Sequence, residues 1–437
     1  MRISVIGCSY LGAVTSSCLA RLGHDVTGVD IDPRLVDELS AGRAPFFEPG
    51  LQDLLSEQAG TGRLRYTTDA AAVAGSAVHF VCVGTPQRMG ENAADLSQVD
   101  AAIEALLPSL APGDVVVGKS TVPVGTATRL AARIAEAQPE ATLVWNPEFL
   151  REGFAVEDTL HPDRIVYGLP DGPAGARAKL VLDEVYAAPL AEGTPLVVTD
   201  YPTAELVKVA ANSFLATKIS FINAMAELCE VAGADVTALA DAIGHDDRIG
   251  RKFLNAGIGF GGGCLPKDIR AFMARAGELG ADQALTFLRE VDTINLRRRD
   301  RVVEIARQVL DGSVIDRRIA VLGAAFKPNS DDVRDSPALD VAARLHVQGA
   351  EVRVTDPHAI ENARRTHPGL TYLAGLDEAV EGADLVLLLT EWREYVSLDP
   401  AELAKLVRTP IVIDGRNVLN PRAWRDAGWT YRGLGRP

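Results

Sequence analysis

Short apolar segments alternate with longer amphipathic segments over the first 150 residues of the chain. The first thirty residues predict a strand at 2–7, a helix at 10–23 and a second strand at 24–30. Strands that alternate with helices in this way are typical of a parallel sheet covered on both faces. We therefore predict an α/β fold. Further strands are expected in AVHFVCVG, DVVVGKS and TLVWNPE.

The pattern changes near Tyr201, where one long helix is predicted over 201–231. More helical sequence follows, and the strand–helix alternation returns near Arg318 with RIAVLG and EVRVTDPH. This last part echoes the first, because both run strand, glycine turn, helix, strand, acidic residue and proline. We predict two Rossmann-like domains with parallel sheets, joined by a long central helix and a helical middle region. The expected domains are 1–200, 201–300 and 301–437.

Composition and charge narrow the functional classes. The 437 residues are enough for two or three domains. A formal net charge of −15 disfavours nonspecific binding to nucleic acids or anionic membranes. No apolar run approaches the ~20 residues that span a bilayer, and no signal peptide precedes the first strand. The five cysteines include no CxxC pair, so we expect a cytoplasmic protein without a disulfide framework or a metal.

The turn GCSYLG after the first strand is a variant of GxGxxG in which Ser9 replaces the middle glycine. Gly7 would permit the tight turn and Gly12 the close packing of helix on strand, while N–H groups at the helix start would hold a pyrophosphate. Asp30 is placed to accept hydrogen bonds from a ribose diol and to repel a 2′-phosphate. The turn therefore predicts NAD rather than NADP, although Arg34 softens that preference. The alternative is a turn that binds no dinucleotide.

The segment GIGFGGGCLPKD (257–268) carries the most distinctive chemistry. Its five glycines in seven residues allow the backbone to approach a ligand closely. The following residues predict a helix with Pro266 in its first turn, which places Cys264 at a helix N-terminus beside Lys267. Both features favour the thiolate, so we predict that Cys264 is a nucleophile. The other cysteines are expected to be small buried side chains: Cys8, Cys18, Cys82 and Cys229.

Three polar side chains extend this candidate site. Lys208 and Asn212 are four residues apart on the long helix and project from one face, where they could bind an oxyanion. Asp268 could act as a base or orient water. Its alternative role is a first-turn carboxylate that complements the helix dipole. A lysine at a helix edge is usually a surface residue, so the pair gains weight only together with Cys264.

The chain resembles the UDP-glucose/GDP-mannose dehydrogenase family from residue 1 to about 420. The resemblance rests on a series of motifs in order, which is far more specific than any one of them. These motifs are GCSYLG, FVCVGTP, STVPVGT, NPEFLREG, AELVKVAANSFLATKISFINAMAELCE, GFGGGCLPKD, FKPNSDDVRDSP and IDGRN.

The resemblance implies a four-electron oxidation of the C6 alcohol of a nucleotide sugar, with two NAD molecules used in turn and no metal. UDP-glucose is the expected donor and UDP-glucuronate the expected product. In this scheme the alcohol becomes an aldehyde, which Cys264 attacks to give a thiohemiacetal. A second oxidation gives a thioester, which water hydrolyses. The scheme explains why a nucleophilic thiol belongs in an alcohol dehydrogenase.

The resemblance also assigns roles by position. Lys208 and Asn212 would stabilise the oxyanion, while Asp268 would activate a water that Thr121 helps to hold. Glu152 would be a general acid/base. The implied catalytic set is Cys264, Lys208, Asn212, Asp268, Thr121, Glu152 and Glu148.

The same carry-over implies two binding sets and a homodimer, with Arg248 reaching across the dimer interface. The N-terminal domain would bind NAD, and the C-terminal domain the nucleotide sugar. The NAD set is Gly7, Tyr10, Leu11, Gly12, Asp30, Arg34, Thr85, Thr121, Glu152, Lys267 and Arg334. The sugar set is Glu148, Phe149, Leu150, Lys208, Asn212, Arg248, Phe253, Phe260, Gly261, Lys327 and Arg416.

The sequence departs from the family pattern at three places: Ser9 replaces a glycine, Gly263 replaces the serine before the thiol, and Arg34 stands where lysine is frequent. The donor also stays open, because a dTDP-sugar or GDP-mannose would undergo the same chemistry. A single-step hydroxyacid dehydrogenase of related fold would have no role for Cys264. A non-catalytic nucleotide-sugar sensor is the third reading, and the intact set of reactive side chains counts against it.

Overall fold

The computed structural model describes residues 1–436. The chain divides into two compact units, described separately here. Unit 1 comprises residues 1–211 and 270–280, and unit 2 comprises residues 212–269 and the described chain from 281 onward. Two of the three boundaries between the units fall within helices, one in α9 (Tyr201–Ala232) and one in α11 (Leu265–Glu278), and the third follows the end of α11.

Unit 1 is built on an eight-stranded sheet of order β3-β2-β1-β4-β5-β6-β7-β8. All neighbouring strands are parallel except the antiparallel pair of β6 and β7. The strands are β1 (Arg2–Ile6), β2 (Asp25–Val29), β3 (Leu64–Thr67), β4 (Val78–Val81), β5 (Val115–Gly118), β6 (Thr142–Trp145), β7 (Ile165–Gly168) and β8 (Leu196–Thr199). The helices are α1 (Tyr10–Arg21), α2 (Pro33–Ser40), α3 (Leu51–Thr61), α4 (Ser97–Leu106), α5 (Thr126–Ala137), α6 (Ala155–Leu160), α7 (Pro173–Val185) and α8 (Ala187–Ala191), with short 3-10 turns at Ala70–Val73 and Leu107–Ser109.

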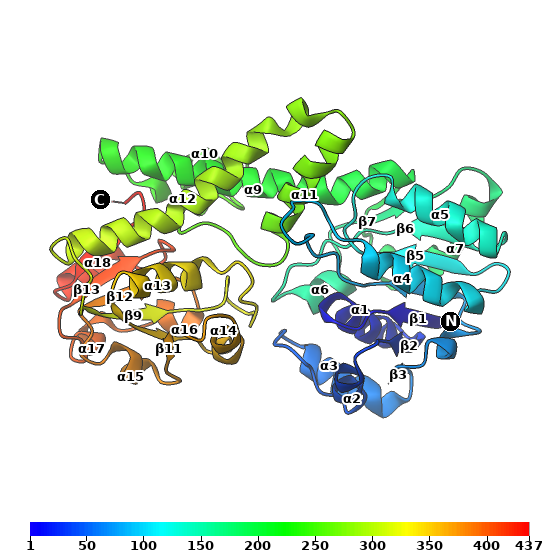
Figure 1. The fold of residues 1–437 in the computed structure, drawn as a ribbon, viewed down its shortest axis with the longest axis horizontal. Coiled ribbons are helices and arrows are strands. Elements are labelled where there is room, and N and C mark those ends of the chain that lie inside the picture. Colours follow the sequence, from blue (N-terminus) through cyan, green and yellow to red (C-terminus); the bar gives the residue numbers. More distant parts are fainter. Residues whose placement is uncertain (437) are drawn as a thin grey trace. The chain divides into compact units, whose positions relative to one another are not determined.

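The continuous apolar runs of unit 1 arise because both faces of its sheet are covered. In β5, Val115 and Val117 belong to one buried cluster, and Val116 belongs to the other. In Figure 1 the strands of unit 1 run between helices. A strand that alternates between two cores has no polar face, which explains its sequence.

Unit 2 contains a six-stranded, wholly parallel sheet of order β11-β10-β9-β12-β13-β14. The strands are β9 (Arg318–Leu322), β10 (Glu351–Thr355), β11 (Thr371–Tyr372), β12 (Leu385–Leu388), β13 (Ile411–Asp414) and β14 (Thr430–Gly433). The helices after α9 are α10 (Val236–Gly244), α12 (Thr286–Val309), α13 (Pro337–Val347), α14 (Ile360–Thr366), α15 (Leu376–Val380), α16 (Arg393–Val396), α17 (Pro400–Leu403) and α18 (Pro421–Asp426), with a 3-10 turn at Asp282–Leu285.

The predicted fold class is confirmed: two Rossmann-like parallel sheets and a long helix are present. The long helix was expected over 201–231 and ends one residue later. Strands β3, β7, β8, β11 and β14 were not predicted. Within residues 1–436, no helix is long and apolar enough to span a bilayer.

Candidate active site

The glycine turn after β1 has the geometry that a dinucleotide needs. Gly7 adopts φ +84°, and a side chain on Gly12 would lie 1.7 Å from the Gly7 carbonyl oxygen. Ser9 begins α1 with an ordinary φ of −67° and makes no capping hydrogen bond through its side chain. The position therefore does not require glycine, and the N–H groups at the start of α1 stay available for a pyrophosphate.

Asp30 supports this turn from the end of β2. Its Oδ2 accepts a hydrogen bond from the Cys8 N–H at 2.6 Å, and its Oδ1 accepts one from the Asp32 N–H at 3.0 Å. The residue remains partly exposed, so the carboxylate can also meet a ribose diol. Arg34 is exposed and paired with Asp32. These features fit NAD, which is the group the sequence predicts here.

Glu48 is a residue of unit 1 that the sequence analysis missed. It is 4% exposed and accepts hydrogen bonds from the Tyr10 hydroxyl, from the Gly153 N–H and from the Ala155 N–H. It thus ties the start of α1 to the segment that carries Glu152. The only signal in the sequence was an acid between aromatic residues and a proline in PFFEPG.

A buried ion pair joins two of the predicted catalytic residues of unit 1. The Lys208 Nζ lies 2.9 Å from a Glu148 carboxylate oxygen, and the other oxygen accepts the Leu150 N–H at 2.7 Å. The Phe149 ring lies between the Arg164 guanidinium, 3.8 Å from its centroid, and the Lys208 ammonium, at 5.8 Å. Lys208 is therefore an interior cation rather than a surface lysine.

A second buried lysine, Lys119, precedes the STVPVGT motif and was also missed. Its Nζ donates to the Asn146 Oδ1 at 3.1 Å and to the Tyr186 hydroxyl at 3.3 Å. Burial lowers the pKa of Lys119. In the same region the Thr85 hydroxyl donates to the Thr121 carbonyl at 2.8 Å, so these two predicted residues are adjacent.

In unit 2, Cys264 stands directly before α11, as predicted. Its carbonyl accepts the Asp268 N–H at 2.9 Å, which is the first hydrogen bond of the helix. Cys264 is exposed, whereas the other four cysteines are buried, as was expected for those four. Burial raises the pKa of Cys82 and of Cys18 to about 12.

Asp268 is the centre of a polar cluster in unit 2. It is 2% exposed, and it accepts hydrogen bonds from the Asn212 amide and from the Lys267 ammonium, both at 2.7 Å. Three predicted residues are thereby brought together. A carboxylate with two side-chain donors has a more specific role than a complement to the helix dipole.

The glycine loop before Cys264 packs against the segment 326–337. A side chain on Gly261 would lie 2.1 Å from the Asp335 carbonyl oxygen, and one on Gly262 would lie 2.7 Å from the Phe326 ring. A side chain on Gly263 would meet the Arg334 guanidinium at 2.3 Å. The replacement of a serine by Gly263 therefore makes room for Arg334, which also pairs with Asp332.

Four further residues of unit 2 were predicted to bind the sugar: Arg416, Lys327, Arg248 and Phe253. The Arg416 guanidinium donates to the carbonyls of Leu389, Gly259 and Phe326 at 2.8, 3.1 and 3.0 Å, so it already anchors the glycine loop. Lys327 lies over the Phe326 ring at 5.3 Å. Arg248 is exposed and paired with Asp246 on its own short segment, and Phe253 has a left-handed φ of 66°.

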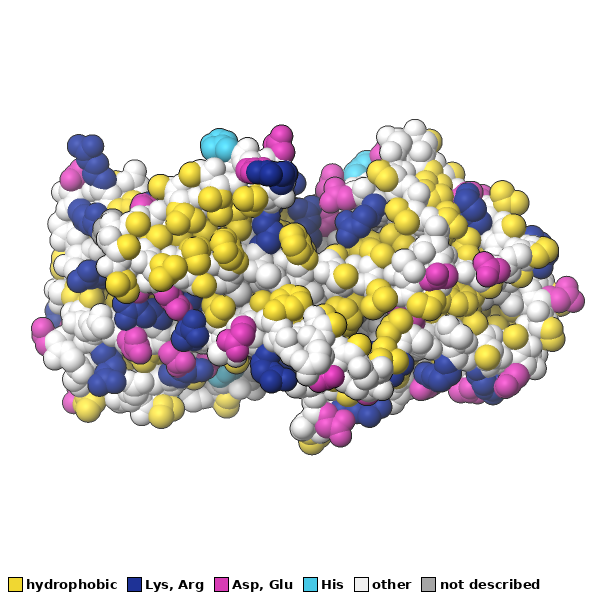
Figure 2. Space-filling view, turned by 90° about the horizontal axis from the view of Figure 1, so that it is seen from above, with side chains coloured by type: hydrophobic (Ala, Val, Ile, Leu, Met, Phe, Trp, Pro, Cys, Tyr) yellow, Lys and Arg dark blue, Asp and Glu magenta, His cyan; other side chains and the backbone are white. Residues whose placement is uncertain are grey.

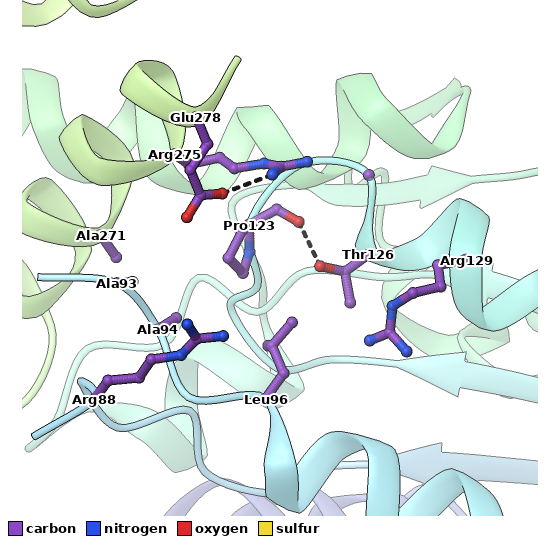
Figure 3. A pocket seen from close by; sticks show the side chains of 11 residues that line it. Arg88, Ala93, Ala94, Leu96, Pro123, Thr126, Arg129, Ala271, Arg275 and Glu278 are labelled. Carbon is purple, nitrogen blue, oxygen red and sulfur yellow. Dashed lines mark hydrogen bonds and ion pairs between the residues drawn. The ribbon is translucent and has the colours of Figure 1, made fainter. Parts of the chain in front are cut away.

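Unit 1 also contains a hollow of about 280 Å³, shown in Figure 3, that is separate from the predicted site residues. Arg88, Arg129 and Arg275 reach it from three segments. Each guanidinium is paired with a carboxylate: Glu91 at 3.8 Å, Asp100 at 2.7 Å and Glu278 at 2.7 Å. Because these charges are balanced, the hollow does not call for an anionic ligand. In the described part of the chain, no cluster of three His, Cys, Asp or Glu side chains is arranged to hold a metal.

Comparison with known proteins gives three adjoining matches to one family. The NAD binding domain of the UDP-glucose/GDP-mannose dehydrogenase family matches residues 1–188, its central domain matches 202–297, and its UDP binding domain matches 320–421. The chain is 44% identical to a UDP-glucose 6-dehydrogenase of Rhizobium meliloti, over all of both chains.

Solved structures agree with this assignment. The model is similar to a UDP-glucose dehydrogenase from Pyrobaculum islandicum, with a TM-score of 0.89 and 38% identity over 100% of this chain and 98% of the other. It is also similar to a UDP-D-ManNAc dehydrogenase from Pyrococcus horikoshii, with a TM-score of 0.87 and 28% identity over 100% and 99%. This chain therefore belongs to the UDP-glucose/GDP-mannose dehydrogenase family and is an NAD-dependent oxidoreductase with a nucleotide-sugar substrate.

Proposed function

We propose that the enzyme oxidises the C6 alcohol of UDP-glucose to the carboxylate of UDP-glucuronate, with Cys264 as the covalent acyl carrier. The observation that carries the proposal is the exposed Cys264 thiol at the start of α11, with Asp268 held one turn later by Asn212 and Lys267. Full-length similarity to enzymes named UDP-glucose 6-dehydrogenase supports the donor.

In the proposed reaction, the alcohol first loses a proton and a hydride to become an aldehyde. The Cys264 thiolate then adds to the carbonyl carbon, and the resulting oxyanion takes up a proton to give a thiohemiacetal. Loss of that proton and of a second hydride turns the thiohemiacetal into a thioester. Water hydrolyses the thioester, which releases the carboxylate and restores the thiol. NAD, when bound, accepts one hydride in each oxidation.

The remaining side chains supply charge and proton transfer. Lys208 and Asn212, four residues apart on α9, would donate hydrogen bonds to the oxyanion of each addition step. Asp268 would accept the proton of the attacking water, with Thr121 holding that water, and Glu152 would act as general acid/base. Glu148 would orient Lys208 through their 2.9 Å ion pair.

The binding roles implied by the family complete the proposal. The glycine turn, Asp30 and the residues assigned with them would bind NAD. The nucleotide sugar would be bound by Phe149, Phe260, Lys327 and Arg416. Arg416 would use the guanidinium N–H groups that do not already donate to main-chain carbonyls.

The decisive measurement is the amount of NADH formed per UDP-glucose consumed by the purified protein. The thioester route predicts a ratio of two, because both oxidations reduce NAD. A ratio of one would replace this proposal with a single-step dehydrogenase, and no NADH with any donor would favour a sensor. Cys264→Ser should stall after the first oxidation or trap an adduct, whereas full turnover by that variant would refute the nucleophile.

The donor is tested by repeating the assay with GDP-mannose, dTDP-glucose and UDP-N-acetylmannosamine. Similarity to a UDP-D-ManNAc dehydrogenase makes the last a useful competitor. UDP-glucose is expected to give the highest kcat/KM. A higher value for another donor would keep the chemistry and change the substrate.

We also propose that the enzyme is a homodimer formed through its helical middle region. Phe214, Phe221 and Leu228 are exposed at seven-residue intervals on α9, and Phe287 is exposed on α12. Figure 2 shows hydrophobic side chains gathered on the face of the molecule seen there. Such a stripe suits a twofold helix-to-helix interface. Phe221→Glu combined with Leu228→Glu should convert a dimer to a monomer in sedimentation equilibrium, and a wild-type monomer would refute the proposal. A cytoplasmic location stays a prediction.

A further inference from the structure

The main chain of the glycine loop is held by a side chain from a distant helix. Asn295, in the middle of α12, is 0% exposed. Its Oδ1 accepts the Phe260 N–H at 2.7 Å, and its Nδ2 donates to the Phe260 carbonyl at 2.9 Å. One carboxamide therefore pairs with both polar groups of one residue, as a neighbouring strand would.

Two arginines extend this contact along α12. Arg298 donates from Nε to the Gly257 carbonyl at 3.3 Å, and Arg299 donates from Nη2 to the Phe260 carbonyl at 3.4 Å. With Asn295 they occupy positions i, i+3 and i+4, which share one helix face. Both arginines are buried, although three consecutive arginines in a sequence usually indicate a solvated helix. This face of α12 therefore contacts the loop at Gly257 and Phe260, and its arginines are also held by ion pairs with carboxylates outside the loop.

The absence of a side chain at Gly259 makes the contact possible. Gly259 adopts φ +93°, and a Cβ there would lie 2.5 Å from the Asn295 Oδ1. On the side towards Cys264, the Gly262 N–H donates to the Arg334 carbonyl at 2.9 Å. Phe260 and Gly262 are thus both fixed, and only Gly263 separates the second of them from Cys264.

We propose that Asn295 is a positioning residue for Cys264: it sets the path of the glycine loop, and so the place of the thiol, without touching the substrate. This inference rests on the proposed function, in which the thiol must meet an aldehyde carbon. A displacement of about 1 Å at a reacting group can cost about 100-fold in rate, so a loosened loop should be visible in kcat.

The test compares Asn295→Leu, which removes both hydrogen bonds at similar volume, with a matched control. Asn420→Ala also loses two hydrogen bonds to main-chain N–H groups, those of Arg422 and Ala423 at the start of α18. The control should keep wild-type kcat. Asn295→Leu should lose about 100-fold in kcat while its affinity for NAD changes less than about tenfold, since the glycine turn and Asp30 lie in unit 1 and only Lys267 and Arg334 of the predicted NAD set lie in unit 2.

Hydrogen exchange of residues 257–264 separates positioning from general stability. Asn295→Leu should speed exchange in this peptide, and Asn420→Ala should not. If Asn295→Leu does not fold, Asn295→Asp is used, because it keeps the acceptor and volume but loses the donor. It should show both effects at smaller size. Wild-type kcat or wild-type loop exchange in a folded variant would overturn the proposal.

A failure of the proposed function would be recognised separately, because the wild type would then form no NADH from UDP-glucose. In that case the rate of Cys264 alkylation by iodoacetamide decides the inference. A change of at least about threefold between wild type and Asn295→Leu, absent in Asn420→Ala, supports positioning of the thiol. Equal alkylation rates would overturn it.

Discussion

The first strand–helix–strand segments of the two sheets can be compared residue by residue. Gly7 follows β1 with φ +84°, and Gly323 follows β9 with φ +112°. Asp30 follows β2, and Asp356 follows β10. In both units the aspartate accepts hydrogen bonds from the N–H groups of the turn, so the two segments share one supporting device.

The two aspartates differ in how many further hydrogen bonds their carboxylates can accept. Asp30 accepts two main-chain hydrogen bonds and stays partly exposed. Asp356 is 3% exposed and accepts five, which exceeds the about four lone-pair sites of a carboxylate. Its donors are the N–H groups of Ala324, Ala325, His358 and Ala359 and the Trp392 indole. Asp356 has no acceptor left for a ribose.

The helix starts differ in the same sense. Ser9 leaves the first N–H groups of α1 without a side-chain cap, whereas the Ser336 hydroxyl accepts the Leu339 N–H at 3.3 Å at the start of α13. Pro337 removes one further N–H there. We call the turn of unit 1 the open turn, because no side chain caps the first N–H groups of its helix. In unit 2 the corresponding turn is closed by side-chain acceptors. Binding depends on unused donors and acceptors, which the topology alone does not supply.

The largest expected contrast concerns the side chain inside the open turn. Cys8 is buried, and burial raises its pKa, as it raises the pKa of Cys82 to about 12. At pH 8 such a thiol is ionised roughly a thousand-fold less than an ordinary one of pKa about 8.5. Iodoacetamide should therefore label only Cys264 in the native protein, with labelling of Cys82 rising as the pH approaches 12. Labelling of Cys8 at pH 8, detected by peptide mass spectrometry, would show that the reagent reaches the interior of the turn and would contradict this prediction.

Closing the open turn sterically should abolish NAD binding. In Gly12→Val the side chain must displace the Gly7 carbonyl oxygen, which lies 1.7 Å from its Cβ position. We expect at least about 100-fold weaker NAD binding by calorimetry, because the helix start moves away from the pyrophosphate. Gly60→Ala, at a helical glycine with open space around it, is the control. Normal NAD affinity in Gly12→Val would mean that the dinucleotide binds elsewhere.

Replacing each of the two aspartates by alanine tests the comparison of the two turns most directly. Asp30→Ala should weaken NAD binding by about 10- to 100-fold, the effect of losing hydrogen bonds to a charged group. Asp356→Ala should leave NAD affinity unchanged and lower the free energy of unfolding by about 3 kcal/mol, because it leaves buried donors without a partner. Urea denaturation and calorimetry on both variants check the pattern. Loss of NAD affinity in Asp356→Ala alone would reverse the assignment of the two turns.

The smallest effect is expected at Ser9, which replaces the middle glycine of the GxGxxG motif. Ser9 has an ordinary backbone conformation, so Ser9→Gly should change the Kd of NAD by less than about threefold. The corresponding change in unit 2, Ser336→Ala, removes a cap and should cost about 1 kcal/mol of stability. A tenfold gain in NAD affinity for Ser9→Gly would show that the serine side chain obstructs the pyrophosphate.

The fold class could be predicted because the apolar run of β5 has no polar face and lies between recognisable helices. Strand β8 could not be predicted, because Val197 and Val198 are exposed and because its pairing depends on the residues of β7, which are remote in the sequence. The start of α5 shows the same limit: the Gly125 and Ala127 N–H groups donate to Glu205, 78 residues or more away. No local start signal is needed there.

The site divides along the same line. Asp30 and Cys264 were predicted because a turn or helix start next to them in sequence defines their environment. Glu48 and Asn295 were not, because most of their partners are main-chain atoms of remote segments, and every residue type carries main-chain atoms whatever its side chain. Asn212, Lys267 and Asp268 were assigned to one candidate site, but the hydrogen bonds that join them were not predicted.

The way α12 holds the glycine loop has a consequence for evolution. Asn295 pairs with atoms of Phe260 that every residue type except proline possesses, so an exchange of the Phe260 side chain leaves the support in place. Evolution can therefore sample other side chains at this position by single substitutions, without changing the main-chain contacts that support the loop. Gly259 is denied that freedom, since any side chain there would meet the Asn295 carboxamide.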